Sequence, residues 1–261
     1  MGPGSMTTGQ IICLIAAAGA GGAINAVAGG GTLVTFPTLL LVGTPPVVAN
    51  ATSTLALLIG NSGGILGYRQ HVPAVKPLLS RFLLVSLLGG SIGSVLLTLT
   101  SNRLFSKLVP FLILFATVLF LAQGLVRRLL NQTPAEGNSE GRVRLTIGFQ
   151  FVVAVYGGYF GAGIGILMLA LLGFIGLRNI HEMNTLKTVL GALINLVAAI
   201  WFILLGLIDW PKAALMTLGA LAGYYLGSHY SQKVPQKTVR VAITAIGFTL
   251  SAITFYKEFV R

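Results

Sequence analysis

The stretch AGGGTLVTFPTLLLVGTPPVVANATST, residues 28–54, interrupts an otherwise apolar region with three consecutive glycines and then with two prolines. A second stretch, AGIGILMLALLGFIGLRNIHEMNTLKT, residues 162–188, aligns with it without a gap at an offset of 134 residues. Along the whole chain, glycine, asparagine and proline dominate the matches at this offset, whereas chance matches between apolar segments would be mostly leucine, alanine and valine. The pattern predicts a chain built from two copies of one unit.

The same offset continues along the chain. It pairs Asn50 with Asn184, Thr54 with Thr188, Asn61 with Asn195, Pro77 with Pro211, Gly89 with Gly223 and Gly93 with Gly227. We expect an expression scar at residues 1–5, a first membrane repeat at 6–126, a polar linker at 127–144 and a second membrane repeat at 145–261. The composition of the linker is typical of a flexible surface segment.

Composition places both repeats in a membrane. Of the 261 residues, 55% are hydrophobic and only 8% are charged, and the mean hydropathy is +0.89. Soluble domains carry about 25% charged residues. No charged residue occurs before Arg69, and several later charge-free runs reach the roughly 20 residues that cross about 30 Å of hydrocarbon as a helix. The predicted fold class is therefore an all-α polytopic membrane protein.

The positions of lysine and arginine indicate how the repeats are oriented. If each repeat crossed the membrane four times, ten basic residues would lie on one face and seven on the other. If the glycine-rich start of each repeat dips in and returns, the number of crossings is odd and the division becomes twelve against five. Basic residues concentrate on the cytoplasmic side, so the second arrangement is favoured. It consists of two inverted repeats, each a glycine-broken, re-entrant helical hairpin plus about three spanning helices. The linker is then cytoplasmic and both termini lie outside.

The two glycine-rich breaks are the predicted binding site. Glycines within a span leave backbone N–H groups that lipid cannot satisfy, and such groups at a helix N-terminus favour an anion. Inverted-repeat transporters place their substrate between broken helices of the two halves. Asn50 and Asn184 suit helix-start positions, with hydroxyl donors nearby. The predicted anion site comprises Gly29, Gly30, Gly31, Thr32, Asn50, Thr52, Ser53, Gly163, Gly165, Asn184, Lys187 and Thr188.

Glycines can instead serve close helix packing. This interpretation is better for Gly89 and Gly93, and for their partners Gly223 and Gly227, because a four-residue spacing resembles small-xxx-small contacts. Two interpretations, a pathway lining or a hydrogen bond between helices, stay open for Asn25, Asn61 and Asn195.

Lys187 is the ionisable residue that stands out. It precedes a charge-free run and corresponds to Ser53 in the first repeat, so it breaks the symmetry. A lysine at the bilayer centre costs about 2.5–3.5 kcal/mol, and such residues are usually partnered or functional. A lysine at a helix end can instead snorkel to the interface, and both interpretations stay open. The same holds for Glu182 and His181, which either take part in proton coupling or lie in a loop where Glu182 pairs with Arg178.

Several other functions are not indicated. No nucleophile–base–acid set and no cluster of metal ligands is recognisable, so we expect neither enzymatic activity nor a cofactor. The net charge of +12 arises from basic residues in loops between spans, where they act as topology signals, and nucleic-acid binding is not expected. The expected partners are a small anionic substrate and membrane lipid, and homodimerisation is left open.

Three motifs carry a resemblance to a known family. AVAGGGTLVTFP (26–37), PPVVANATS (45–53) and GGYFGAG (157–163) resemble the sulfite exporter TauE/SafE family of bacterial and archaeal permeases. The likeness covers essentially the whole chain after residue 5. It implies a protein of the prokaryotic cytoplasmic membrane that exports or takes up sulfite, sulfonates or related sulfur-containing anions. It does not fix the substrate, because members of the family handle different compounds.

Three classes of function remain to be compared. A secondary transporter is favoured, because an inverted repeat supplies two halves that can rock about a central site. A passive anion channel would use the same broken helices. A membrane-embedded receptor or structural subunit would need a partner surface, for which only the linker and short loops are available.

Overall fold

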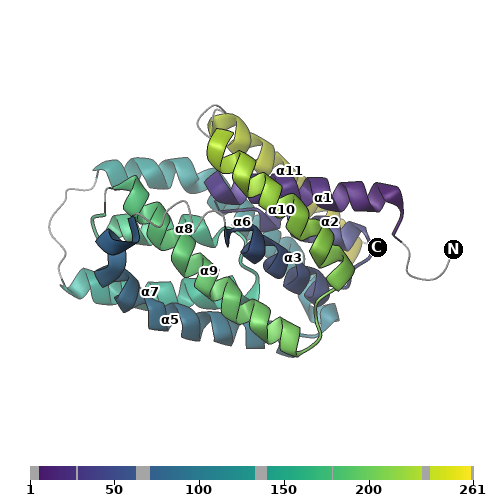
Figure 1. Cartoon of the computed structure of the whole chain (residues 1–261), viewed down its shortest axis with the longest axis horizontal. Coiled ribbons are helices and arrows are strands. Elements are labelled where there is room, and N and C mark those ends of the chain that lie inside the picture. Colours follow the sequence, from purple (N-terminus) through teal and green to yellow (C-terminus); the bar gives the residue numbers. More distant parts are fainter. Residues whose placement is uncertain are drawn as a thin grey trace.

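Every regular element in the described part of the chain is a helix, which confirms the predicted all-α class (Figure 1). The computed structural model describes residues 6–27, 29–62, 71–132, 140–177, 179–230 and 236–259. The helices are α1 (Thr8–Val27), α2 (Thr32–Leu41), α3 (Pro46–Gly60), α5 (Val72–Leu99), α6 (Asn102–Gln132), α7 (Glu140–Tyr159), α8 (Ile164–Phe174), α9 (Ile180–Leu204), α10 (Trp210–Tyr230) and α11 (Gln236–Phe259).

The expected scar and the middle of the expected linker lie outside the described residues. Residues 1–5 and 133–139 are not described. Helix α6 continues to Gln132 and α7 begins at Glu140, so both ends of the segment predicted as a flexible linker, 127–144, are helical.

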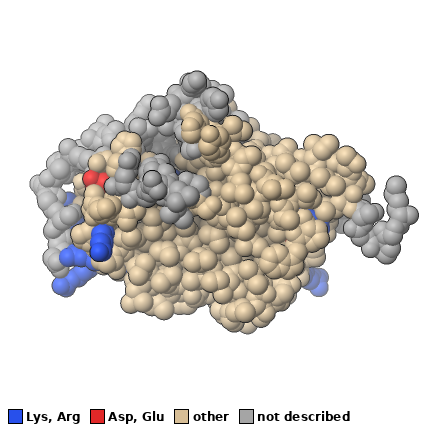
Figure 2. Space-filling model, viewed as in Figure 1, with Lys and Arg blue, Asp and Glu red and all other residues tan. Residues whose placement is uncertain are grey.

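The surface of the molecule is that of a multi-pass membrane protein. Four helical segments of the described chain are long and apolar enough to cross a bilayer: Thr8–Ala26, Val72–Leu99, Asn102–Ala122 and His181–Leu204. Large apolar side chains on different helices, including Leu84, Leu99 and Leu218, are more than half exposed. In Figure 2, the visible lysine and arginine side chains lie at the two ends of the molecule, and a broad uncharged belt separates them. An apolar belt of this kind matches the hydrocarbon of a bilayer.

Glycine ends the first helix of each half in the same way. The backbone N–H of Gly29 donates to the carbonyl oxygen of Ile24 at 3.3 Å, and that of Gly161 donates to the carbonyl oxygen of Tyr156 at 3.1 Å. Both glycines have φ of +79°, a left-handed conformation that side chains with a Cβ rarely adopt. A short helix, α2 or α8, follows each break.

The helices form two series that correspond along the chain. Helices α1, α2, α3, α5 and α6 are matched in order by α7, α8, α9, α10 and α11. The pairing between them is exchanged: α1 packs along α10, and its counterpart α7 packs along α5. The counterparts α6 and α11 pack on each other, as do α3 and α9. The first helix of each half is therefore held by the other half.

Small residues make these exchanged contacts possible. A Cβ added to Gly93 would clash with the carbonyl oxygen of Val155 in α7, and one added to Gly223 would clash with the carbonyl oxygen of Gly19 in α1. These glycines allow the backbones to approach closely, as the packing interpretation predicts.

Substituting alanine for Gly93 should destabilise the α5–α7 contact by about 1–3 kcal/mol, because the added methyl group meets backbone rather than a movable side chain. The measurement is thermal unfolding of the purified protein in detergent. The matched control is Gly148→Ala on α7, where an added Cβ has no atom within 4 Å and helix propensity favours alanine by about 0.5–1 kcal/mol. Equal unfolding temperatures for the two variants would contradict the packing role of Gly93.

Candidate functional site

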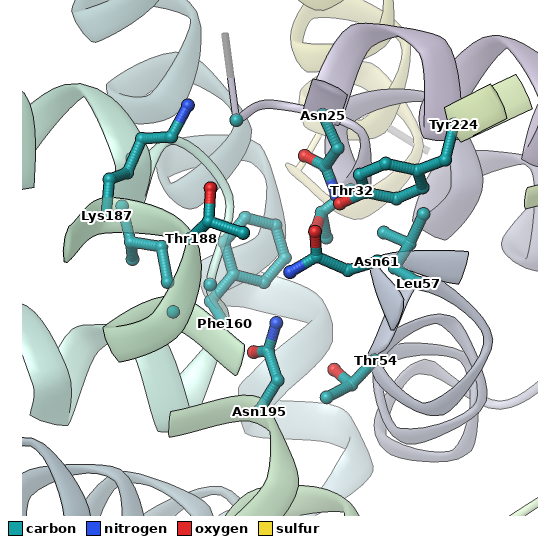
Figure 3. Close-up of a pocket in the computed structure, with 15 residues that line it drawn as sticks. Asn25, Thr32, Thr54, Leu57, Asn61, Phe160, Lys187, Thr188, Asn195 and Tyr224 are labelled. Atoms are coloured by element: carbon teal, nitrogen blue, oxygen red, sulfur yellow. The ribbon is translucent and has the colours of Figure 1, made fainter. Parts of the chain in front are cut away.

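A cavity of about 60 Å³ lies where the two breaks meet. This volume holds only a few water-sized groups, so it suits a small ligand. Figure 3 shows Lys187 and Thr188 on one side, Asn25, Asn61 and Tyr224 on the other, and the ring of Phe160 between them. The residues that line it are Asn25, Gly29, Thr32, Thr54, Leu57, Asn61, Phe160, Gly161, Ile164, Gly165, Lys187, Thr188, Gly191, Asn195 and Tyr224.

Two matched helical stripes form opposite walls of this cavity. Helix α3 contributes Thr54, Leu57 and Asn61, and α9 contributes their counterparts at the offset of 134: Thr188, Gly191 and Asn195. Residues spaced by three and four positions share one face of a helix. Since α3 and α9 pack on each other, residues at matching positions of the two series line the same cavity.

The two breaks contact each other backbone to backbone beside the cavity. A Cβ added to Gly29 would lie 3.1 Å from the Cα of Gly165. The backbone N–H of Gly165, in the first turn of α8, has no hydrogen-bond acceptor within the described chain. A helix N-terminus with an unsatisfied N–H group favours a negative charge.

Hydrogen bonds from α1 and α7 hold the breaks in place. The side-chain oxygen of Asn25 accepts the backbone N–H of Gly31 at 2.8 Å, and the Tyr156 hydroxyl donates to the carbonyl oxygen of Ala162 at 2.8 Å. Asn25 also shares a side-chain hydrogen bond with Tyr224. Asn25 thus connects the first glycine break and the cavity to α10.

Lys187 is the charged residue of the site. It is 7% exposed, lines the cavity and lies two turns inside α9. No carboxylate of the described residues forms an ion pair with its ammonium group. Its counterpart Ser53 is fully buried away from the cavity, where its hydroxyl lies 2.6 Å from that of Thr35. The burial of Lys187 is at odds with a snorkelling position at a helix end.

Five of the predicted site residues line the cavity: Gly29, Thr32, Gly165, Lys187 and Thr188. Three others are engaged in contacts within the protein. The Asn50 amide donates to the carbonyl oxygen of Tyr159 at 3.1 Å, the Thr52 hydroxyl accepts the backbone N–H of Asp209 at 3.1 Å, and Ser53 pairs with Thr35. These contacts join α3 to α7, to the start of α10 and to α2.

The expectation that Asn50 and Asn184 occupy helix starts is wrong. Helix α3 begins at Pro46, whose fixed φ suits a first helical position. Helix α9 begins after Asn179, whose side-chain oxygen caps it by accepting the N–H of His181 at 3.0 Å. Both asparagines therefore lie in the second turn. Asn184 does not line the cavity.

The remaining predicted glycines, Gly30, Gly31 and Gly163, do not line the cavity either. Gly30 and Gly31 permit close approaches instead, and Gly163 has a positive φ. A Cβ on Gly30 would clash with the ring of Phe120, and one on Gly31 would clash with the carbonyl oxygen of Gly21. Gly163 precedes α8 with φ of +82°.

His181 and Glu182 lie at the start of α9, outside the cavity lining. The Glu182 carboxylate accepts a hydrogen bond from the Asn179 amide at 3.0 Å. The ring of His181 stacks on that of His71, with centroids 5.3 Å apart. Arg178, the suggested partner of Glu182, lies outside the described residues.

Sequence reasoning left several cavity residues unassigned. Asn25, Asn61 and Asn195 had two open interpretations, and all three line the cavity. Thr54 could have been identified from the repeat, because it aligns with Thr188, a predicted site residue. Nothing in the sequence marked Phe160 or Tyr224 as cavity residues, because aromatic residues occur throughout this chain.

A buried aromatic cluster adjoins the cavity. The Phe160 ring meets Phe36 of α2 edge-on at a centroid distance of 5.3 Å, and Phe105 of α6 lies 6.1 Å from Phe36. All three rings are at most 1% exposed. Phe160 therefore separates the polar cavity from a densely packed apolar region.

Within the described chain, no three His, Cys, Asp or Glu residues gather as metal ligands.

Comparisons with known proteins agree with this architecture. The family model described as "Sulfite exporter TauE/SafE" matches residues 13–254. A "Probable membrane transporter protein" of Haemophilus influenzae is 29% identical over 90% of each chain. "Probable membrane transporter protein ORF9" of a Sinorhizobium species is 28% identical over 91% of this chain and 89% of the relative. "Probable membrane transporter protein YfcA" of Escherichia coli K12 is 26% identical over 90% of this chain and 86% of the relative.

A search of the solved structures found no significant match. The family match covers most of the chain, including both breaks and both matched stripes of the cavity. The chain therefore belongs to the sulfite exporter TauE/SafE family of membrane transporters.

Proposed function

We propose that this protein is a secondary transporter that moves a small sulfur-containing anion, such as sulfite or a sulfonate, across the cytoplasmic membrane by alternating access. The observation that carries the proposal is the cavity between the two broken helices. There, a buried lysine, a backbone N–H group with no acceptor among the described residues, and several neutral hydrogen-bonding side chains converge. Such a set can bind an oxyanion through charge and hydrogen bonds.

The arrangement of the chain supports two halves of inverted topology. Helix α1 begins and α11 ends near the right-hand end of Figure 1, whereas α6 ends and α7 begins near the left-hand end. A half that starts at one end and finishes at the other crosses an odd number of times. The second half then runs in the opposite direction, as in transporters that rock about a central site. The distribution of basic residues favours a cytoplasmic location for the end of the molecule at which α6 ends and α7 begins.

The same broken helices would also serve a passive anion channel, and transport kinetics separates the two functions. The experiment measures uptake of radiolabelled sulfite by proteoliposomes under anaerobic conditions. A transporter should saturate with substrate, and unlabelled sulfite inside the vesicles should accelerate uptake of the label. Non-saturating uptake that follows the membrane potential, with no acceleration by internal sulfite, would favour a channel. Uptake equal to that of empty liposomes would contradict both.

A further inference from the structure

We infer, on the basis of the proposed function, that the cavity selects its substrate by charge and accepts monoanions in preference to dianions. A simple alkanesulfonate such as methanesulfonate carries one negative charge at any physiological pH, whereas sulfate and thiosulfate carry two. Sulfite exists as hydrogen sulfite or as the sulfite dianion, and the two forms exchange near neutral pH. The inference therefore assigns hydrogen sulfite, rather than the dianion, as the bound form of sulfite.

The inference follows from the charges around the cavity. Among the described residues that line it, Lys187 is the only one that carries a charge at neutral pH. Tyr224 is the other titratable side chain of the lining, and its phenol is neutral in this range. The buried polar residues of the described chain are mostly hydroxyl-bearing, and Lys187 is the only ionisable side chain among the buried residues besides tyrosine. Within the described part of the lining, one positive charge is thus available to the ligand.

A single lysine balances a single negative charge. A bound monoanion and the ammonium group together are neutral, and the neutral groups Thr188, Asn195 and the Gly165 N–H can complete the hydrogen bonding. A bound dianion would leave one uncompensated negative charge within the membrane-embedded core. Burying an unpaired charge is costly, and transport requires the site to be closed from both sides at some stage. The closed state should therefore favour the neutral complex.

This charge rule supplies a route for proton coupling that needs no protein carboxylate. Hydrogen sulfite that binds on one side of the membrane can release its proton after leaving on the other side. Each transport cycle then moves one proton with each sulfur atom, and the proton is carried on the substrate oxygen. His181 and Glu182, which lie outside the cavity lining, are not required for this coupling.

The test compares four ligands on the full-length protein in lipid nanodiscs by calorimetry: methanesulfonate, sulfite, sulfate and thiosulfate. We expect sulfate and thiosulfate to bind at least tenfold more weakly than methanesulfonate. Between pH 6 and pH 8, the affinity for sulfite divided by that for methanesulfonate should fall about tenfold. The ratio cancels any titration of the protein itself, because both ligands meet the same site.

Two outcomes would overturn the inference while leaving the proposed function in place. One is sulfate or thiosulfate binding as tightly as methanesulfonate, and the other is a sulfite-to-methanesulfonate ratio that does not change with pH. If none of the four ligands binds saturably, the proposed function fails and this inference fails with it.

A second cation should shift the preference. Asn61 lines the cavity from α3 and is partly exposed, so Asn61→Lys can add a charge opposite Lys187. The ratio of sulfate affinity to methanesulfonate affinity should rise at least tenfold in this variant. Asn61→Gln, which adds length without charge, is the matched control and should leave the ratio unchanged. Similar ratios in a folded Asn61→Lys variant and in the wild type would contradict selection by charge.

Discussion

Lys187→Gln is expected to weaken binding of the transported anion by about 30- to 1,000-fold and to abolish measurable uptake at low substrate concentration. Removing one partner of a buried, hydrogen-bonded charge pair costs about 2–4 kcal/mol, and every 1.4 kcal/mol is a factor of ten in affinity. The side chain of Lys187 is 7% exposed and lines the cavity. The measurement is the dissociation constant of methanesulfonate, with radiolabelled sulfite uptake as the functional readout.

The stability of the same variant should move in the opposite direction. The ammonium group is buried and has no ion-pair partner among the described residues, so exchanging it for a neutral side chain should leave the unfolding temperature unchanged or raise it. Lys76→Gln is the matched control, because Lys76 is exposed on α5 and should affect neither binding nor stability. A Lys187→Gln protein that binds within threefold of wild type would place the anion elsewhere. A protein that loses binding only because it unfolds at a much lower temperature would assign Lys187 a structural role.

Much of the helical architecture could be predicted from composition and repetition. Charge-free runs of about 20 residues in a chain with 8% charged residues imply spanning helices, because no other element satisfies its own backbone in lipid. Glycine is required where the first helix of each half ends at positive φ, so Gly29 and Gly161 mark the breaks in the sequence itself. The exchanged packing of α1 on α10 and of α7 on α5 could not be predicted, since it depends on contacts between distant segments.

Asn50 and Asn184 were predicted to bind the anion, and the structure places them one turn away from the candidate cavity. Asn50 and Asn184 lie on the same helical stripes as Thr54 and Thr188, which line the cavity one turn further along α3 and α9. Spacing by four residues identifies a face, but it does not say where along that face a cavity opens. Because spans are apolar on all sides, the pattern of hydrophobic residues adds no information on rotation. Thr52 was assigned to the site and lies instead in a contact with Asp209.

Gly29→Ala is expected to reduce uptake at least tenfold, because Gly29 carries two requirements at once. Its φ of +79° disfavours any residue with a Cβ by about 1–2 kcal/mol. In addition, the new methyl group would stand 3.1 Å from the Cα of Gly165, so the two breaks would have to separate by a few tenths of an ångström. The separation would move the Gly165 N–H and the wall of the cavity relative to Lys187.

Comparison with Gly43→Ala separates the effect of the contact with Gly165 from the effect of the positive φ. Gly43, in the turn between α2 and α3, has φ of +83°, and an added Cβ there has no atom within 4 Å. Both variants should therefore lose about 1–2 kcal/mol of stability from backbone strain, but only Gly29→Ala should lose binding and uptake. Thermal unfolding measures the shared cost, and methanesulfonate affinity measures the difference. If the two variants transport equally well, the contact between the breaks does not shape the anion site, and Gly29 serves only to end α1.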